Sequence, residues 1–262
     1  MQRTPVSPPV SSFRALRRQA GFSLVELMVG ITVGLLVVVA AIGSLAFTQA
    51  SSTVVVDSAG LQQKADAIFR NIASHVEQAG AFNVEQAGDP AKIIFSAGFT
   101  GFNKTGFYIQ GKEGASNAPD TLQVSYQNDG TGNLRDCMGN PLAGTGNFDN
   151  EFYVDNGNLM CKGADAKVDA QSIADGIEDF QVTYGVQTFV GTVPQYQYYR
   201  YDQVLDWRFI HAVQICLQLA GDTQGNPRVG PAFKGCRDQD IANDGKIRRL
   251  FRRTFSIRNA LL

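Results

Sequence analysis

Residues 17–26 read RRQAGFSLVE, in which a basic and polar leader ends at Gly21 and an apolar run follows at once. The run continues to Phe47, and after Glu26 its only polar residues are one threonine and one serine. An apolar stretch of this length can cross the hydrocarbon core of a bilayer as a helix. Residues 22–47 are therefore predicted to form a helix that lies in lipid or among other apolar helices.

The charges before the run predict its orientation. Arg14, Arg17 and Arg18 precede the run, and no acidic residue comes before Glu26. Positive charge is retained on the cytoplasmic side of a membrane, so residues 1–21 should stay in the cytoplasm while the rest crosses. An ordinary secretory signal has a shorter apolar region that is followed by a small-residue cleavage site. The expected cut in this chain therefore lies before the apolar run.

Glu26 is a lone carboxylate five residues into the run. A charge in apolar surroundings is costly unless a cation lies beside it. The segment GFSLVELMVGITVGLL, residues 21–36, resembles the class III signal of type IV pilins and type II secretion pseudopilins. The resemblance implies cleavage after Gly21 by a prepilin peptidase, N-methylation of Phe22, and pairing of Glu26 with the terminal amine of a neighbouring subunit. A plain membrane anchor with an incidental glutamate is the simpler alternative.

A second helical pattern follows the apolar run. Residues 48–79 contain no proline, and apolar side chains recur there every three or four positions, at Leu61, Ala65, Ile68, Ile72 and Val76. This spacing places them on one face of a helix, and Gly80 is a natural stop. We expect one helix over residues 22–79, of which residues 48–80 form an amphipathic stalk.

Beyond Gly80 the pattern changes to short apolar segments broken by Gly, Asn and Asp. The expected strands cover residues 92–95, 106–110, 121–127, 151–154, 159–162, 178–186, 207–219 and 249–257. Asn156-Gly157 predicts a tight hairpin between two of them. Residues 81–262 are thus predicted to form a β-rich domain with an antiparallel sheet packed on the end of the long helix, an α+β architecture.

The segment 207–219 alternates most regularly. Its odd-numbered residues are predicted to share one buried face: Trp207, Phe209, His211, Val213, Ile215, Leu217 and Leu219.

Four cysteines lie on the expected exported side: Cys137, Cys161, Cys216 and Cys236. An even number in an oxidising compartment favours disulfides. Three pairings exist, and we favour Cys137–Cys161 with Cys216–Cys236, because each closes a short loop around a turn-rich segment. A bridge of that size contributes about 3 kcal/mol.

The sequence shows little sign of catalysis. It contains no phosphate-binding glycine loop and no metalloprotease or serine-hydrolase motif. Its two histidines are His75, on the predicted stalk helix, and His211, on the predicted apolar strand face. We expect a protein that is not an enzyme and has no cofactor.

Calcium is the one cofactor that the sequence raises. Asp238, Asp240 and Asp244 lie close together, but an EF-hand loop starting at Asp238 would need glycine where Asn243 stands and glutamate where Arg249 stands. A calcium loop of another kind, as in J-type pseudopilins, and a solvated acidic turn remain as alternatives, of which the turn is favoured.

Two further clusters raise nucleic-acid binding. One is basic (Arg248, Arg249, Arg252, Arg253 and Arg258) and one is aromatic (Tyr196, Tyr198, Tyr199 and Tyr201). Such residues can bind single strands. However, the four basic residues of the leader leave 19 Lys and Arg against 24 Asp and Glu after cleavage, so charge does not favour a nucleic-acid partner. A surface strand and a packed or subunit-facing loop are the favoured interpretation.

Segments of the predicted domain are similar to the PilW group of type IV minor pilins: LRDCMG, EFYVDNGNLMC, ADGIEDFQVTYGV, DWRFIHAVQICL and RRTFSIRNAL. The resemblance implies a pilin fold and an inner-membrane protein with a periplasmic domain. Its implied partners are other minor pilins, the major pilin, prepilin peptidase and the assembly platform, in starting a pilus for motility, adhesion or DNA uptake. A secretion pseudopilin and a non-assembling membrane-anchored binding module are the alternatives.

Overall fold

The computed structural model describes residues 21–82, 107–128, 131–141, 146–165, 167–222, 233–241 and 243–260. The chain forms two compact units, which divide between Gln49 and Ala50. Helix α1 (Leu24–Val76) contributes residues to both units. The long helix expected over residues 22–79 is thus confirmed, with ends that lie two or three residues inside the expected bounds.

The second unit contains the strands, and every strand pair is antiparallel. A five-stranded sheet has the order β1-β2-β3-β4-β5, with bounds Ile109–Lys112, Thr121–Gln127, Asn147–Asp155, Asn158–Lys162 and Gln171–Ala174. A four-stranded sheet has the order β11-β8-β6-β7, with bounds Arg248–Ser256, Ile210–Ala220, Ile177–Val190 and Val193–Tyr199. A small pair joins β9 (Phe233–Lys234) to β10 (Asp240–Ile241), and 3₁₀ turns lie at Ala115–Asn117, Tyr201–Gln203 and Trp207–Phe209.

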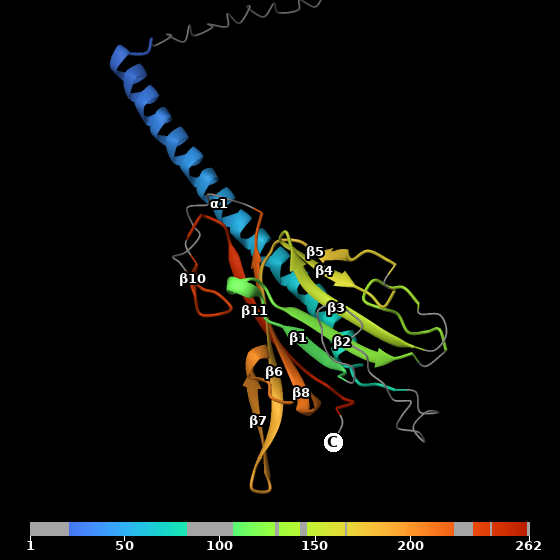
Figure 1. Cartoon of the computed structure of the whole chain (residues 1–262). Coiled ribbons are helices and arrows are strands. Elements are labelled where there is room, and N and C mark those ends of the chain that lie inside the picture. Colours follow the sequence, from blue (N-terminus) through green and yellow to red (C-terminus); the bar gives the residue numbers. More distant parts are fainter. Residues whose placement is uncertain are drawn as a thin grey trace, which may run out of the picture. The chain divides into compact units, whose positions relative to one another are not determined.

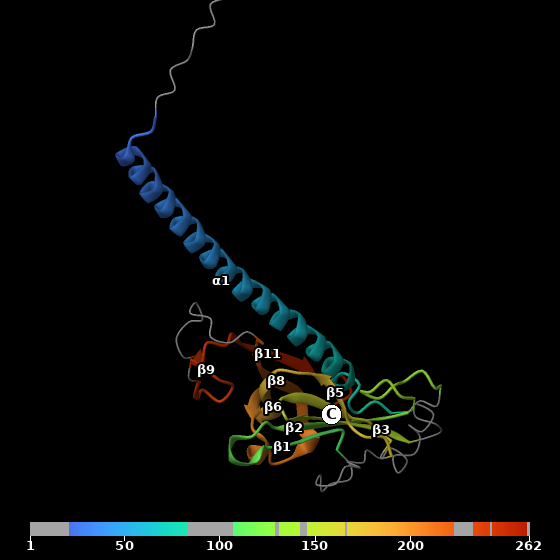
Figure 2. The ribbon, with the colours of Figure 1, turned by 90° about the horizontal axis from the view of Figure 1, so that it is seen from above.

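The part of α1 that belongs to the second unit packs on both larger sheets (Figures 1 and 2). The predicted apolar stripe is confirmed, because all five of its members are buried. Phe69 contacts Phe255 of β11, with ring centroids 6.0 Å apart, and His75 contacts Phe152 of β3 at 5.9 Å. Burial of this face stabilises the helix more than its intrinsic propensity does.

Several strand predictions need correction. We expected one antiparallel sheet, and the structure has two larger sheets and a small pair. The strand expected at 106–110 is β1, which begins at Ile109 and runs on to Lys112, and the strand expected at 92–95 lies outside the described residues. Strands β5 and β7 were missed, since the tyrosines of β7 were interpreted as part of a loop.

The predicted buried face of residues 207–219 is only partly correct. Strand β8 begins at Ile210, and its register against β6 shifts where Gly185 pairs with Ala212 and Val186 pairs with Ile210. His211 is the extra residue at this bulge, so the alternation changes phase there. Ile210 is consequently buried, whereas His211 is half-buried and Phe209 is exposed.

Glycine turns close both prominent hairpins. Asn156 and Gly157, predicted as the turn between β3 and β4, have φ angles of 48° and 75°, as a type I′ turn requires. Between β6 and β7 the turn consists of Gly191, with a φ of 66°, and Thr192. Both turns match the twist of the strands that they join, and they fix the register of the two hairpins.

Candidate functional site

The start of α1 is capped locally. The Ser23 hydroxyl accepts a hydrogen bond from the Val25 amide at 3.3 Å, and the Ser23 carbonyl accepts one from the Leu27 amide at 3.1 Å. This is the usual role of an N-cap serine, which satisfies an amide that has no partner within the helix. Residues 21–23 therefore lead directly into the helix, and they place the Gly21–Phe22 junction just before its first turn.

The apolar half of α1 keeps its polar groups inside the helix. The hydroxyl of Thr32 donates to the Val29 carbonyl and that of Ser44 to the Ala41 carbonyl, each at 2.9 Å. Backbone and hydroxyl groups are thus satisfied without an outside partner, which a segment in lipid or in an apolar bundle requires.

In the part of the chain that the structure describes, every residue from Gly21 to Gln49 is exposed. The most apolar stretch of α1 has no buried residue, and it is long and apolar enough to cross a membrane. Phe22 is 82% exposed, and its large apolar neighbours along the helix are also exposed. A continuous apolar surface of this size indicates a surface that is covered by lipid or by other proteins.

Glu26 lies in the first turn of this helix. Among the residues that the structure describes, none forms an ion pair with it. A carboxylate at a helix N-terminus gains about 0.3–1 kcal/mol from the helix dipole. That gain is smaller than the cost of moving a lone charge out of water. The position therefore needs a cation from outside the described chain when the apolar surface is covered.

The arginines near the C-terminus do not form a free basic patch. Arg248 bonds to Glu178 at 2.6 Å and to Asp244 at 2.5 Å, and Arg253 bonds to Asp66 at 2.8 Å. Arg258 pairs with Glu77 at 2.8 Å, while Arg249 and Arg252 donate to a serine hydroxyl and a backbone carbonyl. The partners Asp66, Glu77 and Glu178 come from distant parts of the sequence, and the ion pairs reduce the positive potential that nucleic acid would need.

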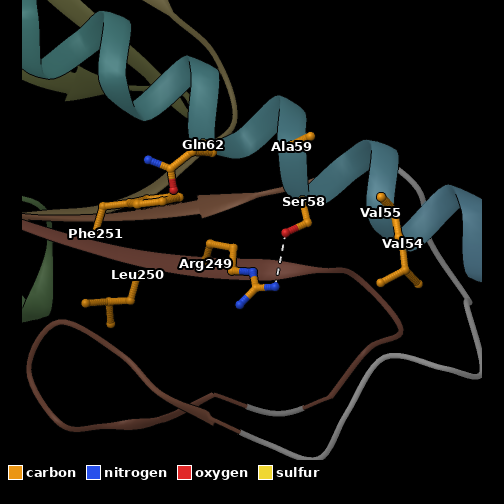
Figure 3. A pocket seen from close by; sticks show the side chains of 8 residues that line it. All are labelled: Val54, Val55, Ser58, Ala59, Gln62, Arg249, Leu250 and Phe251. Carbon is orange, nitrogen blue, oxygen red and sulfur yellow. Dashed lines mark hydrogen bonds between the residues drawn. The ribbon is translucent and has the colours of Figure 1, made fainter.

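Figure 3 shows where one of these arginines reaches α1. An open groove of about 730 Å³ lies between the helix and β11, lined by Val54, Val55, Ser58, Ala59, Gln62, Arg249, Leu250 and Phe251. The Arg249 guanidinium donates to the Ser58 hydroxyl at 3.0 Å across it. The groove thus carries one cationic contact between otherwise mostly apolar walls.

The three calcium candidates are not brought together. The carboxylate of Asp240 pairs with Lys234 at 2.8 Å, and hydrogen bonds from Arg248 lower the pKa of the Asp244 carboxyl below its usual range. Asp238 occupies a left-handed turn with a φ of 59°. Within the described ranges, no group of three metal-ligating side chains is found. The structure therefore gives no support to calcium binding by Asp238, Asp240 and Asp244.

The four cysteines form the two favoured pairs. Cys137 is bonded to Cys161, with Cα atoms 6.1 Å apart, and Cys216 is bonded to Cys236, with Cα atoms 5.8 Å apart. The first bridge ties the loop after β2 to β4, and the second ties the segment between β9 and β10 to β8. Both fix long connections onto the sheets.

The two histidines lie apart and in different surroundings. His75 is buried, and its Nδ1 lies 3.0 Å from the Tyr126 hydroxyl, which donates to the Arg135 carbonyl at 2.9 Å. Burial lowers the pKa of His75 to about 4, although the nearby Asp136 opposes this shift. His211 lies edge-on to Tyr196, and its pKa is lowered by partial burial. His75 therefore joins the helix to β2 in its neutral form.

Two family models match the chain. One, the prokaryotic N-terminal methylation motif, covers residues 16–42, and the other, type IV pilus-assembly protein W, covers residues 148–259. Together the two matches support a type IV pilus minor pilin of the PilW family. The first match covers the junction at Gly21 and most of the apolar run, and the second extends from the start of β3 to just beyond β11. The resemblance inferred from the sequence is thereby confirmed.

One solved structure adds a more distant similarity. A type IV-like pilin from Thermus thermophilus is 13% identical, with 77% of this chain and 97% of that chain covered and a TM-score of 0.48. No curated protein matches the chain in sequence. PilW proteins are pilins, a structural class and not a class of enzymes.

Sequence reasoning missed one prominent surface. Of the described residues of the second unit, the β6–β7 hairpin and the residues after it carry most of the exposed large apolar side chains, among them Phe189, Val193, Tyr196, Tyr198 and Leu205. Glycine followed by threonine between two uncharged, aromatic-containing segments was an available hairpin signal.

Proposed function

We propose that this PilW-family pilin is an assembly subunit that helps to start type IV pilus growth and becomes part of the pilus. The observation that carries the proposal is the uncovered apolar helix with one carboxylate in its first turn. Prepilin peptidase cleaves after Gly21, and Phe22 becomes the methylated N-terminus. The apolar helix then moves from the bilayer into a bundle of pilin helices.

Within the bundle, the Glu26 carboxylate pairs with the terminal amine of Phe22 on a neighbouring subunit. This pairing supplies the cation that the described chain lacks at that position. It also makes the association selective for register, because only one axial offset between adjacent helices brings the two charges together. The folded second unit determines which pilins are its neighbours.

The proposal fixes the location and the partners. Before assembly the protein is anchored in the inner membrane by residues 22–47, with residues 1–21 in the cytoplasm and the β-rich part in the periplasm. Its partners are the prepilin peptidase, other minor pilins, the major pilin and the inner-membrane assembly platform. Adhesion, twitching motility and DNA uptake are activities that such a pilus would serve.

Replacement of Glu26 tests the assembly step. Glu26→Ala and Glu26→Gln should each reduce the number of surface pili at least tenfold in a strain that lacks the native gene, while the protein stays in the membrane at normal level. Glu77→Gln is the matched control, because it removes a carboxylate just beyond the same helix, where the partner is Arg258. Normal piliation by both Glu26 variants would contradict the mechanism.

The mature N-terminus gives a second reading of the same proposal. Mass spectrometry of the purified protein should find a chain that begins at Phe22 and carries one added methyl group. If deletion of the gene left pili intact and instead blocked protein secretion, the chain would be assigned to a secretion pseudopilus.

A further inference from the structure

Strand β7 forms an open edge of the four-stranded sheet. Among the strands that the structure describes, its one neighbour in the sheet is β6 (Figure 1). Apart from the half-buried Tyr199, every residue of β7 is exposed. An uncovered edge of this kind presents unpaired backbone groups to which another strand can bind.

The register of the hairpin shows which backbone groups are unpaired. Val190 pairs with Val193 across the two-residue turn, and Thr188 and Val186 pair with Gln195 and Gln197. In a hairpin with a two-residue turn, the two residues of each such pair hydrogen-bond to each other through their backbone N–H and C=O groups. The residues that lie between these pairs direct their backbone N–H and C=O groups away from the partner strand. The N–H and C=O groups of Tyr196 and Tyr198 therefore face away from the sheet.

Strand β7 carries no charged side chain that would oppose pairing with a second strand. From Gly185 to Tyr199 the chain contains no charged residue. Natural edge strands are commonly protected by charges, by bulges or by a covering element. Pro194 removes one outward N–H near the turn, but it leaves the tyrosine positions open.

The side chains of Tyr196 and Tyr198, whose backbone groups face outward, are ordered by contacts with neighbouring residues. A Cβ on Gly185 would lie 3.2 Å from a ring carbon of Tyr198, so the tyrosine ring lies over the glycine. The Tyr196 ring lies edge-on to His211 with centroids 6.3 Å apart. Tyrosines that are already ordered lose little conformational entropy when a partner covers them.

We infer that a second copy of this chain pairs with β7 through its own β7, antiparallel and about a two-fold axis at Gln197. The sequence Tyr196-Gln197-Tyr198 is the same in both directions. Antiparallel pairing at this register places Tyr196 opposite Tyr198 of the second copy, and each pair can exchange the outward backbone groups. A two-fold contact uses the same patch on both partners.

The side chains and charges fit this occupant. Opposite residues of antiparallel strands lie on the same face, so the four tyrosines of the two copies gather on one face of the joined sheet. Because neither strand carries charge, the two copies meet without repulsion at this site. A pair of seven-residue strands buries less than the roughly 1,200 Å² of a stable interface, so the pairing is reversible and depends on local concentration.

Cysteine cross-linking in the full chain tests the register. All four native cysteines are in disulfides, so Gln197→Cys adds the only free thiol. At the two-fold axis the two introduced residues would have Cα atoms about 4.5 Å apart, within disulfide range. We expect most of the mature protein in membranes to become a disulfide-linked dimer on mild oxidation, seen on a non-reducing gel.

Val193→Cys is the matched control, because Val193 is also exposed and lies in the same strand. The register places its two copies eight residues apart, or about 27 Å, so this variant should stay at least fivefold less dimeric. Adding Tyr196→Lys to Gln197→Cys should abolish the dimer while Trp207 fluorescence shows that the domain is folded. A Glu26→Ala/Gln197→Cys variant should still cross-link, which separates this pairing from the assembly step at Glu26.

Three outcomes would overturn the inference. One is Gln197→Cys that stays monomeric, and another is Val193→Cys that cross-links equally well. The third is a Gln197→Cys product with a different protein in place of the dimer, which would show that β7 receives a strand of another subunit.

Discussion

The two edge strands of the four-stranded sheet, β11 and β7, differ in how far other parts of the chain cover them. Four of the nine residues of β11 are arginines, and Arg249 and Arg253 bond to Ser58 and Asp66 of α1. Strand β7 has no charged residue and no contact of this kind with the helix among the described interactions. One edge strand, β11, is thus bound to the helix and stabilises the fold, whereas the other, β7, is left available for contact with another molecule.

The difference arises from what lies behind each strand. Phe255 of β11 is buried against Phe69 of the helix, so β11 is part of the core as well as an edge. Phe189, in the part of β6 that pairs with β7, is 64% exposed. Burial contributes about 25 cal/mol per Å² of apolar surface, and the β6–β7 hairpin receives little of it. We therefore expect stability to be concentrated at the β11 side.

The largest expected effect is loss of the ring on the β11 side. Phe255→Ala should lower the free energy of unfolding by about 3 kcal/mol, because it leaves a cavity beside Phe69. Phe189→Ala is the matched control and should change it by less than about 0.5 kcal/mol. The single tryptophan, Trp207, is buried and reports unfolding of this unit in denaturant. Equal effects of the two variants would remove the distinction between the edges.

Acid should act through the helix-covered core and not through the β7 side. In the unfolded chain His75 titrates near 6.5, whereas in the folded protein its pKa is about 4. The unfolded state therefore takes up the proton first, and stability falls as the pH falls from about 6.5 to about 4, then levels off for this group. The total loss is about 3 kcal/mol.

The His75→Leu variant isolates the contribution of His75 protonation to the loss of stability. Because several carboxylates also titrate below pH 5, the useful quantity is the difference in unfolding free energy between the native protein and the variant at each pH. We expect the native protein to lose stability relative to His75→Leu as the pH falls, while the same comparison for His211→Leu, at the half-buried position beside β7, should change in the same direction by a smaller amount. A pH-independent difference for His75→Leu would contradict the assignment of a buried neutral histidine.

The smallest expected effect concerns the arginines of β11. The Arg253 guanidinium lies 4.9 Å from the Phe69 ring centroid and bonds to the half-buried Asp66. Arg253→Ala should shift the denaturation midpoint by about a quarter of the Phe255→Ala shift or less, since exposed ion pairs contribute little. Arg252→Ala, which removes only a contact to a backbone carbonyl, should shift it less still. If Arg253→Ala matched Phe255→Ala, charge and not packing would hold this edge.

Prediction from the sequence succeeded where a buried face requires apolar residues at regular spacing or where a turn requires particular residues. The stripe from Leu61 to Val76 and the turn at Asn156-Gly157 are local patterns with one structural solution each. Strand β7 escaped prediction because neither of its faces is buried, so no alternation of apolar and polar residues marks it. The bulge at His211 also escaped, since an extra residue in a ladder depends on the partner strand and not on the local sequence.

The functional residues likewise fall into those that a local sequence pattern indicates and those whose contacts depend on distant residues. Gly21, Phe22 and Glu26 stand out in the sequence because the order leader, junction and lone carboxylate is local. The arginines were correctly expected on a strand, but their ion pairs could not be predicted, because the partners Asp66, Glu77 and Glu178 lie up to 187 residues away. The acidic turn was favoured over a calcium site at Asp238, Asp240 and Asp244, and two of its carboxylates pair with cations close in the sequence, Asp240 with Lys234 and Asp244 with Arg248.

The way in which residues 257–259 meet the end of α1 affects how the protein is made. The Asn259 side chain donates to the carbonyls of Glu77 and Ala79, and the Ile257 amide donates to the His211 carbonyl. The helix and β11 therefore close on each other only after the chain up to Asn259 has left the ribosome. Until then β8 lacks its neighbour β11, and the growing chain carries a bare strand that chaperones or rapid completion must protect.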